Sequence, residues 1–371
     1  MSYQIPKRLT DMRAVRQSAR RIDAYQIPKR LTDMTPYKPI SGSYRIRLDA
    51  NESFLDIPKG ARKEFAEAVE SMRYNRYPDA YASKLCRAFA DYHKIPTELI
   101  TAGNGSDELI NVISEAFLKD ESKVAVIPPD FSMYAFYANL RRAKIVAYPT
   151  QVDYRVDCDD LIELVKNEKA DMLIFSNPCN PTSRVIPRDS VRYIVENTPC
   201  LVVIDEAYMD FSNQSVLNFV SDYDNLIVLR TMSKAFACAA LRVGFAIANI
   251  KLTNVLKAVK SPYNVNAVSQ ALAEILLRYE SEARSAVRCI IESRDKLYAE
   301  LKTLKTVMGA RFIPLEPSAN FVYIKTDKAD EIYAKLLEDG IAVRYFEKRL
   351  RITAGSETEN AEIIEKLRLY K

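Results

Sequence analysis

A single lysine, Lys234, stands among residue types that could support chemistry on a carbonyl compound. It lies in the stretch 225–245, with the hydroxyls of Thr231 and Ser233 just before it and Arg242 eight residues after it. Two hydroxyls and a guanidinium around one amine suit an anion, and a lysine amine becomes nucleophilic toward carbonyls when neighbouring charges or desolvation lower its pKa. Most lysines are ordinary surface residues, so the surroundings of Lys234 must decide between the two interpretations.

A glycine-bearing loop at 101–108 (Thr-Ala-Gly-Asn-Gly-Ser-Asp-Glu) runs directly into an apolar helical pattern at 109–117. The first turn of a helix presents free backbone N–H groups, which attract an anion such as a phosphate. Ser106 or Asp107 could equally be an ordinary N-cap, with Glu108 in the first turn. The loop by itself leaves both interpretations open.

Glycine is scarce, with 8 in 371 residues, against a usual share of ~7%. Four of the eight, Gly103, Gly105, Gly244 and Gly355, fall inside the stretches singled out for chemistry. A glycine retained in so glycine-poor a chain indicates a backbone position that tolerates no larger residue.

Further polar residues follow predicted buried strands. Asp205 comes directly after Leu-Val-Val-Ile, and Asn180 sits in the loop 177–181 (Asn-Pro-Cys-Asn-Pro). A carboxylate at the end of a buried strand needs a cationic or donating partner, and the two prolines fix a tight loop that could include a cis bond. Arg351, in the run 350–355, suits a carboxylate or phosphate. Capping of a neighbouring element, or a salt bridge across the sheet, explains each residue alone about as well.

Composition narrows the class of protein. Residues 1–40 hold nine Lys/Arg against three Asp (+6), and the remainder holds 45 Lys/Arg against 46 Asp/Glu (−1). The folded body is therefore neutral, and nucleic acid is not expected as a partner. No window approaches the ~18 apolar residues of a membrane span. The six cysteines include no C-x-x-C pair, which favours buried free thiols in a reducing cytoplasm over disulfides or zinc.

His93 is the only histidine. A single histidine excludes a two-histidine metal site and disfavours a Ser-His-Asp hydrolase, so a surface role is expected for His93 and no metal site is expected. Proton transfer must then come from Lys, Asp, Glu or Tyr.

Apolar runs that predict strands alternate with helical patterns through the middle of the chain. Strands are expected at 124–127, 144–148, 171–175, 200–204, 225–229 and 243–248, and helices such as 159–168 and 188–197 lie between them. This alternation predicts a mainly parallel sheet covered on both faces, with ligands bound beyond the carboxyl ends of the strands.

The two ends of the chain differ from this middle part. A long helical stretch from 267 to about 305 is followed by short strands at 320–325, 341–345 and 350–353 and by a closing helix at 360–369. At the other end, Tyr3–Met12 is repeated identically at Tyr25–Met34, which favours a local duplication artefact over a functional element. We therefore divide the chain into an N-terminal extension (1–35), an arm of the small domain (36–55), a large domain (56–265) and a small α+β C-terminal domain (266–371).

Taken together, the motifs resemble those of fold-type-I enzymes that depend on pyridoxal 5′-phosphate, and most of all the histidinol-phosphate aminotransferase family. The resemblance runs from about residue 36 to the C-terminus. It rests on an ordered set of stretches: Leu-Asp-Ala-Asn-Glu at 48–52, Arg-Tyr-Pro-Asp at 76–79, Gly-Asn-Gly-Ser-Asp-Glu at 103–108, Asn-Pro-x-Asn-Pro-Thr at 177–182, Asp-Glu-Ala-Tyr at 205–208, Leu-Arg-Thr-Met-Ser-Lys-Ala-Phe at 229–236, Leu-Arg-Val-Gly at 241–244 and Leu-Arg-Ile-Thr at 350–353. It implies an α/β fold with three layers, a mainly parallel seven-stranded sheet in the large domain and a smaller α+β C-terminal domain.

The resemblance also implies roles at the cofactor. Lys234 would bind it covalently and then act as the base that moves a proton from the substrate α-carbon. Asp205 would pair with the ring nitrogen, and Asn180 and Tyr208 would hydrogen-bond the phenolic oxygen of the ring. Phe131 would stack on the ring. The phosphate would be held by Gly105, Ser106, Asp107, Thr231, Ser233 and Arg242.

Other implied roles lie at the substrate and at a subunit interface. Arg351, with Arg344, Tyr37 and Asn51, would grip the anionic end of the substrate. Tyr77 would reach the phosphate of the neighbouring subunit's cofactor, which implies a homodimer. The chain departs from the family at 237–240 (Ala-Cys-Ala-Ala), where a glycine-containing loop is usual, at Phe131, where a tyrosine is common, and at Ser53-Phe54, where Asn-Pro is usual.

The leading hypothesis is a cytoplasmic aminotransferase that transfers an amino group between a donor like histidinol phosphate and the pair 2-oxoglutarate and glutamate. A decarboxylase or lyase on the same scaffold, such as a threonine-phosphate decarboxylase, is the nearest alternative, beside an aminotransferase for aromatic or other amino acids. A binding or regulatory domain without activity is a third possibility, disfavoured because Lys234, Asp205 and Arg242 are all retained.

Overall fold

The structure is a computed structural model of the chain, and it describes residues 26–27, 29–32, 40–305, 309 and 311–370. The chain divides into two compact units, Met1–Ser43 and Tyr44–Lys371. The described part of the first unit contains a short helix, α2 (Lys29–Thr32). The first copy of the duplicated segment, Tyr3–Met12, lies outside the described residues, as does Tyr37.

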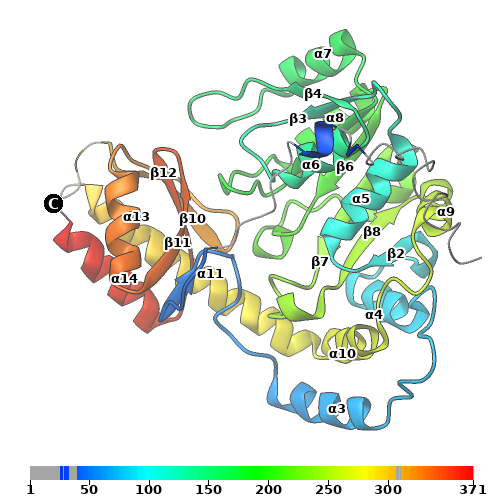
Figure 1. Cartoon of the computed structure of the whole chain (residues 1–371), viewed down its shortest axis with the longest axis horizontal. Coiled ribbons are helices and arrows are strands. Elements are labelled where there is room, and N and C mark those ends of the chain that lie inside the picture. The colour runs from blue at the N-terminus through cyan, green and yellow to red at the C-terminus, as the bar shows by residue number, and fades with distance from the viewer. Residues whose placement is uncertain (1–25, 28, 33–39, 306–308, 310, 371) are drawn as a thin grey trace, which may run out of the picture. The chain divides into compact units, whose positions relative to one another are not determined.

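The second unit is built on a seven-stranded sheet with the strand order β2-β8-β7-β6-β5-β3-β4 (Figure 1). The strands are β2 (Ile100–Gly103), β3 (Lys123–Val126), β4 (Lys144–Ala147), β5 (Met172–Ser176), β6 (Leu201–Asp205), β7 (Leu226–Thr231) and β8 (Gly244–Ala248). All pairs from β4 to β7 are parallel, whereas β8 is antiparallel to both β7 and β2. The predicted α/β fold with a mainly parallel seven-stranded sheet is confirmed.

Helices cover both faces of this sheet. They are α4 (Ser83–His93), α5 (Ser106–Phe117), α6 (Met133–Leu140), α7 (Cys158–Glu168), α8 (Arg188–Asn197), α9 (Ile250–Val259) and α10 (Ala267–Arg278), with short 3₁₀ turns η2 (Thr97–Leu99), η3 (Met209–Phe211), η4 (Leu217–Asp222) and η5 (Ala239–Leu241). A further helix, α3 (Lys59–Glu70), packs on α10. Along β5 the side chains alternate: Leu173 and Phe175 join a core with α4, α7, α8 and α10, while Met172 and Ile174 join a core with α5, α6 and α9. This alternation, which follows the period of two in a strand, produces the three layers.

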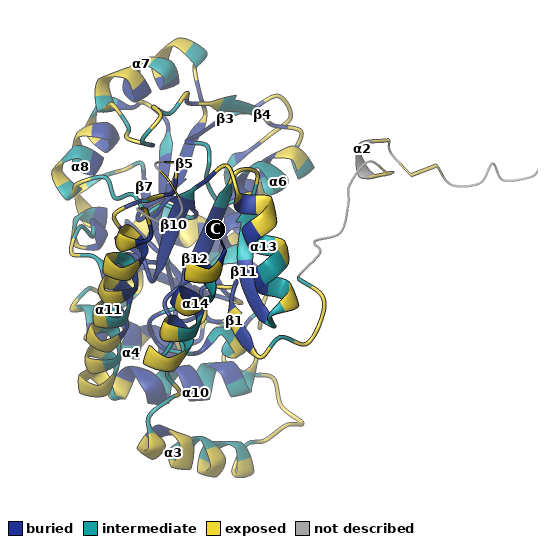
Figure 2. Cartoon of the chain, turned by 90° about the vertical axis from the view of Figure 1, so that its left-hand side faces the viewer, coloured by how far each residue is buried: buried dark blue, intermediate teal, exposed yellow. Residues whose placement is uncertain are grey.

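A second, five-stranded sheet has the order β1-β11-β12-β10-β9. Its strands are β1 (Ile46–Leu48), β9 (Ile313–Pro314), β10 (Phe321–Lys325), β11 (Ile341–Phe346) and β12 (Arg349–Thr353), and the helices α11 (Glu280–Thr303), α13 (Ala329–Glu338) and α14 (Glu357–Leu369) accompany it. Buried residues of these elements form a separate hydrophobic core, visible in Figure 2 as dark blue strands behind half-exposed helices. β1 pairs in parallel with β11, so the segment before the large sheet completes the smaller one.

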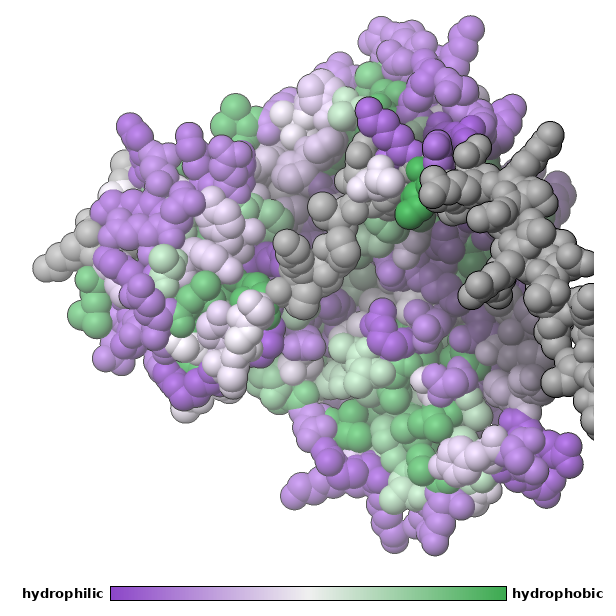
Figure 3. Space-filling view, in the orientation of Figure 1, coloured by the Kyte–Doolittle hydropathy of each residue, from purple (hydrophilic) through white to green (hydrophobic). Residues whose placement is uncertain are grey.

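Several elements differ in detail from the sequence prediction. The region 101–108 was expected as a loop, but Ile100–Gly103 is a strand, and α5 begins at Ser106. The long helical stretch from 267 is two helices, because Tyr279 leaves helical geometry between α10 and α11 (φ −89°, ψ 50°). α10 packs against α3 and α4, and Figure 3 shows hydrophobic side chains gathered over these helices. Among the helices of the described residues, none has the length and apolar character that crossing a membrane requires.

Candidate active site

Lys234 follows the carboxyl end of β7, and its partly buried side chain reaches toward the N-terminal segment of the second unit. Its Nζ donates a hydrogen bond to the backbone oxygen of Ala50, at 2.9 Å, and lies 5.9 Å from the centre of the Tyr208 ring. Burial of the amine, followed by the positive charges of Arg351 and Arg242, lowers the pKa of Lys234 to about 8. A substantial fraction of this amine is therefore neutral near physiological pH, as nucleophilic chemistry requires.

Three residues from the end of β7 and the following loop form a connected polar group. Thr231 Oγ1 donates to Ser233 Oγ at 3.0 Å, and the Arg242 guanidinium donates to the same Ser233 oxygen at 3.2 Å. Arg242 also donates to the backbone oxygen of Ala239 at 3.1 Å. The predicted grouping of the two hydroxyls and the guanidinium is thus present in space as well as in sequence.

The N-terminus of α5 lies against this group. Gly105 is the N-cap residue and has φ +86°, a conformation that favours glycine. A Cβ at Gly105 would come within 2.7 Å of a terminal nitrogen of Arg242, and a Cβ at Gly244 would come within 2.3 Å of the backbone nitrogen of Ser106. No side chain fits at either glycine, because the backbone of Gly105 lies against Arg242 and that of Gly244 lies against Ser106. The N-terminus of α5 and the Arg242 guanidinium are thereby brought together.

Asp107, in the first turn of α5, contributes differently from its neighbours. Its carboxyl accepts a hydrogen bond from the Tyr137 hydroxyl at 3.1 Å, and burial raises its pKa. Within the described chain, its Oδ1 is buried and has no hydrogen-bond partner. Because a carboxylate repels an anion, the group that Asp107 offers an anion is its backbone N–H.

Asp205 ends β6 on the side of the sheet that α6 covers. Tyr134 donates its hydroxyl proton to Asp205 Oδ2 at 2.8 Å, and the backbone N–H of Ala207 donates to Oδ1 at 3.0 Å. Burial raises the pKa of Asp205 to about 6, while these two hydrogen bonds oppose the rise. The donating partner that the sequence required for this carboxylate is therefore Tyr134, which sequence reasoning had not assigned.

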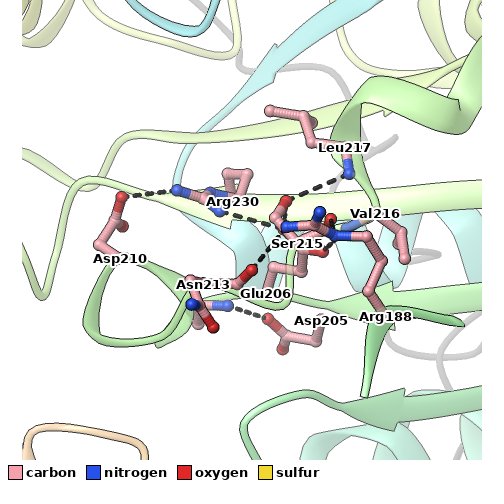
Figure 4. Close-up of polar contacts among 10 residues, drawn as sticks. Arg188, Asp205, Glu206, Asp210, Asn213, Ser215, Val216, Leu217 and Arg230 are labelled. Atoms are coloured by element: carbon pink, nitrogen blue, oxygen red, sulfur yellow. Dashed lines mark hydrogen bonds and ion pairs between the residues drawn. The ribbon is translucent and has the colours of Figure 1, made fainter. Parts of the chain in front are cut away.

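Glu206, the next residue, has a different environment. Its carboxylate pairs with Arg230 at 3.0 Å and accepts a further bond from the Ser215 hydroxyl, and Arg230 in turn pairs with Asp210 at 2.6 Å. Figure 4 shows Arg230 between Asp210 and Glu206. Two adjacent buried carboxylates thus have opposite partners: Glu206 is neutralised by a cation, and Asp205 is held by neutral donors alone among the described residues.

The loop after β5 is anchored by the carboxyl of the partly buried Asp130, a residue that no sequence motif indicated. Asp130 accepts hydrogen bonds from the backbone N–H groups of Ser176 and Phe131, at 2.9 and 2.7 Å, and from the Ser176 hydroxyl. The backbone N–H of Asn180 donates to the Ser176 oxygen at 2.9 Å. The peptide bond between Asn177 and Pro178 is cis, as the two prolines had suggested. Asp130 thereby positions both Phe131 and the loop that carries Asn180.

The five-stranded sheet contributes Arg351 on β12. Its guanidinium donates to the side-chain oxygen of Asn180 and, at 2.6 Å, to the backbone oxygen of Asp49. Arg344 on β11 lies directly opposite Arg351 in the antiparallel register. Like charges at directly opposite positions repel one another, so this pair of strands creates a locally positive region suited to an anion.

Tyr208 and Asn51 meet beside Lys234. Asn51 donates its side-chain N–H to the Tyr208 hydroxyl oxygen at 2.8 Å, and Thr353 on β12 donates to the Asn51 side-chain oxygen at 3.1 Å. Because the Tyr208 oxygen acts as an acceptor here, its own proton remains available for another partner.

Phe131 and Tyr77 are the remaining described residues of the predicted site. Phe131 packs edge-on against Tyr134, with ring centres 5.6 Å apart. Tyr77 is highly exposed, at 82%, and its ring stacks on Tyr263 with ring centres 4.7 Å apart.

The sole histidine, His93, was expected at the surface, but its Nε2 is buried, and burial lowers its pKa to about 2. Within the described ranges, no group of three or more His, Cys, Asp or Glu side chains could hold a metal ion.

Comparison with known proteins identifies the family to which these features belong. The family model described as "Aminotransferase class I and II" matches residues 45–367. The chain is 42% identical over 334 residues to a histidinol-phosphate aminotransferase of Clostridium novyi (strain NT), which covers 89% of this chain and 92% of that protein. It is 35% identical over 330 residues to one of Thermococcus kodakarensis, covering 88% and 93%.

Solved structures share the fold at lower sequence identity. A histidinol-phosphate aminotransferase of Sinorhizobium meliloti, crystallised with pyridoxal-5′-phosphate, superposes with a TM-score of 0.83 over 94% of this chain and 98% of that chain, at 20% identity. An L-threonine-O-3-phosphate decarboxylase of Porphyromonas gingivalis superposes with a TM-score of 0.75 over 88% and 99%, also at 20% identity. Because the family model and the relatives above 30% identity span nearly the whole second unit, the chain belongs to the class I and II aminotransferase family and is a pyridoxal-phosphate-dependent aminotransferase.

Proposed function

We propose that this enzyme transfers the amino group of a phosphorylated amino donor like histidinol phosphate to 2-oxoglutarate, with glutamate as the second product. The observation that carries the proposal is that the positive charges of two arginines, Arg351 and Arg242, act on the Lys234 amine and lower its pKa. One arginine suits the cofactor phosphate and the other suits an anionic substrate. The names of the relatives at 35–42% identity support the choice of donor.

The residues near Lys234 fit the cofactor. A Cβ at Gly105 would meet Arg242, so the absence of a side chain lets the guanidinium lie against the start of α5, where both can bind one anion. The first-turn N–H groups of α5 have no partners within the helix, and they complement a phosphate. We assign the phosphate to the set Gly105, Ser106, Asp107, Thr231, Ser233 and Arg242, with Asp107 acting through its backbone.

Pyridoxal 5′-phosphate, when bound, supplies an aldehyde carbon and an electron-withdrawing ring that stabilises negative charge on the substrate α-carbon. Lys234 is the residue that binds this aldehyde, because its amine has the lowered pKa that such chemistry needs. Once its amine is free again, Lys234 Nζ would be the base that takes the proton from the substrate α-carbon and holds it for the transfer.

Asp205 would hold a proton on the ring nitrogen of the cofactor. Within the described part of the chain, no cation pairs with its carboxylate, in contrast to Glu206, which pairs with Arg230, so the charge of Asp205 is available for a positively charged partner. Asn180 and Tyr208 would hydrogen-bond the phenolic oxygen of the ring, and Phe131 would stack on the ring.

Arg351 and Arg344 bind the anionic end of the substrate, assisted by Asn51. Their directly opposite positions on β12 and β11 allow the same positive region to accept the phosphate of the donor in one half-reaction and a carboxylate of 2-oxoglutarate in the other. Tyr37 was assigned to this group from the resemblance and lies outside the described residues. We further propose that residues 56–265 act as the cofactor-binding domain and that 36–55 and 266–371 act as the substrate-binding one.

The active unit is proposed to be a homodimer in which Tyr77 of one subunit reaches the phosphate site of the other. Tyr74, Tyr77 and Tyr81 are 66%, 82% and 60% exposed, and exposed tyrosines grouped in one loop are typical of protein interfaces. The stacking of Tyr77 on Tyr263 holds its ring in one orientation before any partner is bound.

A panel of amino donors against 2-oxoglutarate tests the proposed reaction. Histidinol phosphate, phosphothreonine and aromatic amino acids are offered in turn, and the formation of glutamate and of carbon dioxide is measured. Histidinol phosphate is expected to give glutamate with the highest kcat/KM. Release of carbon dioxide from phosphothreonine without glutamate would instead indicate a decarboxylase, and turnover confined to aromatic amino acids would contradict the proposed donor.

A further inference from the structure

Tyr134 connects two parts of the proposed cofactor site from a buried position on α6. Its hydroxyl donates to Asp205 Oδ2 at 2.8 Å, and its ring packs edge-on against Phe131 at 5.6 Å. Tyr134 is 2% exposed and Asp205 is 4% exposed, so water does not compete for this hydrogen bond in the folded protein.

The direction of the hydrogen bond is fixed by the surroundings of Tyr134. Burial and the nearby carboxyls of Asp205 and Asp130 raise the pKa of Tyr134 well above its ordinary value. The phenol therefore stays protonated and acts as the donor, and Asp205 acts as the acceptor. A donor to the ionised form of a carboxyl stabilises that form.

Asp205 needs this stabilisation because the other groups around it oppose its ionisation. Burial and the charges of nearby acidic groups favour its neutral form, and the opposing contributions come from Tyr134 and the backbone N–H of Ala207. The acidic or phenolic side chains that face Asp205 from the surrounding elements are Asp107 on α5, Asp130 before α6, Glu206 after β6 and Tyr208.

The hydrogen-bond partner of Asp205 is a neutral phenol, and this determines how much negative charge the carboxylate keeps. An arginine at this position would stabilise the charge of Asp205 but would also neutralise it, as Arg230 does for Glu206. A phenol adds a hydrogen bond and no charge. Asp205 then keeps a full negative charge for a cation that arrives from the other side.

We propose that Tyr134 is a positioning residue that holds Asp205 in its ionised form and aims it at the ring nitrogen of the cofactor. This inference rests on the role proposed above for Asp205. Without the phenol, the proton shared between Asp205 and the ring nitrogen moves toward the carboxyl oxygen. The ring then carries less positive charge and stabilises a negative α-carbon less well.

The first test uses the apoenzyme, with Tyr134→Phe as the variant and Tyr148→Phe as the matched control. Tyr148 is also a buried tyrosine, but its hydroxyl bonds to the backbone of Asp157. Loss of the Tyr134 hydroxyl raises the pKa of Asp205 further, so the decrease in Tm should be larger at pH 8, where the carboxyl is ionised, than at pH 5. The Tm of the control, Tyr148→Phe, should decrease by the same amount at pH 8 and at pH 5. A loss independent of pH in Tyr134→Phe would mean a packing role and overturn the proposal.

The second test observes the ring nitrogen itself in the holoenzyme. With ¹⁵N-labelled pyridoxal phosphate, the ring-nitrogen resonance of Tyr134→Phe should move toward that of an unprotonated pyridine, and kcat should fall with little change in KM. Site-specific 2,3-difluorotyrosine at position 134, a stronger acid and better donor, should move the resonance in the opposite direction. If Tyr134→Phe fails to fold, the difluorotyrosine variant provides the test by itself. Unchanged resonances in these variants would overturn the proposal.

Asp205→Asn separates this inference from the proposed function. If Asp205→Asn shifts the nitrogen resonance and Tyr134→Phe does not, the role of Asp205 stands and that of Tyr134 fails. If Asp205→Asn leaves the resonance unchanged, the assignment of Asp205 fails, and the inference about Tyr134 fails with it.

Discussion

The guanidinium of Arg351 donates a hydrogen bond to the side-chain oxygen of Asn180, and this bond joins the five-stranded sheet to the seven-stranded sheet. A second bond from Arg351 reaches the backbone oxygen of Asp49, beside Ala50, whose oxygen accepts the bond from Lys234. The arginine assigned to the substrate is therefore already oriented by a residue assigned to the cofactor. A substitution at Arg351 should therefore act mainly on substrate binding.

Replacing Arg351 with lysine removes the planar pair of donors and keeps the positive charge. We expect kcat/KM to fall roughly 10- to 100-fold for the amino donor and for 2-oxoglutarate alike, since a hydrogen bond to a charged group contributes about 1.5–3 kcal/mol. Arg349→Lys is the matched control, because Arg349 lies on the same strand and bonds to Tyr154. Steady-state kinetics in both directions measures the effect. A loss confined to one of the two substrates would contradict a shared anion site.

A methyl group at Gly105 should weaken cofactor binding. In Gly105→Ala the new Cβ would approach Arg242 to within 2.7 Å, so the guanidinium must move away from the start of α5, and a residue other than glycine is strained at φ +86°. Fluorescence titration of the apoenzyme with pyridoxal phosphate should give a dissociation constant at least roughly tenfold higher, as expected for a lost charge-assisted hydrogen bond.

Gly340→Ala is the control for backbone strain alone. Gly340 also has a positive φ (+76°), but the nearest atoms to its Cβ would lie 3.9 Å away or more. Its alanine variant should lose stability and bind the cofactor normally. Equal loss of cofactor affinity in the two variants would show that strain, and not displacement of Arg242, is responsible.

Elements whose sequence signal is local were predicted well. The apolar run Leu226–Leu229 is buried on both faces of a parallel sheet, so its pattern directly indicates a strand, and β7 forms there. β2 was missed because Ile-Thr-Ala-Gly has no strong strand pattern, and it is a strand by virtue of pairing with β8, which is far away in sequence. Burial and pairing between distant segments decide such elements, and neither is visible in a short window.

The same limit applies to the site. The side chains that follow strands were found because parallel strands end at one edge of the sheet. Their supporting partners were not found, since the contact between Tyr134 and Asp205 spans 71 positions and depends on where α6 packs. The departure at 237–240 has a structural counterpart: Ala237 has φ +53°, a left-handed conformation in which glycine is favoured.

The rate at which the apoenzyme takes up pyridoxal phosphate should depend on pH through Lys234. Its pKa is lowered from 10.5 to about 8, and the neutral amine is the reactive form. The rate should therefore rise with pH through about 8 and level off above it, whereas a free lysine amine treated with the same aldehyde continues to gain reactivity toward pH 10.

Arg351 offers an internal check on the cause of this shift. Removing its positive charge in Arg351→Gln should raise the pKa of Lys234 and move the midpoint of the rate profile to higher pH, because a like charge no longer disfavours the ammonium form. Arg349→Gln should leave the midpoint in place. A wild-type profile without a midpoint near 8, or one insensitive to Arg351, would contradict this description of the amine.

The proposed homodimer can be tested by mixing two inactive chains. Tyr77→Ala lacks the residue offered to the partner's site, and Lys234→Ala lacks the cofactor lysine, so a mixed dimer with shared sites would contain one intact site and one site with both changes. Random pairing should restore activity to about a quarter of the wild-type sites. If each active site is complete within one chain, mixing will not raise activity above the sum of the separate variants.

Covalent trapping of the cofactor tests the central claim, that Lys234 is the residue which binds it. The holoenzyme is reduced with borohydride and digested, and the modified lysine is located by mass spectrometry. Lys260, which burial also gives a lowered pKa, serves as an internal comparison. The modification is expected on Lys234, with Lys260 unmodified. A modification on Lys260 or any other lysine, or none at all, would contradict the account.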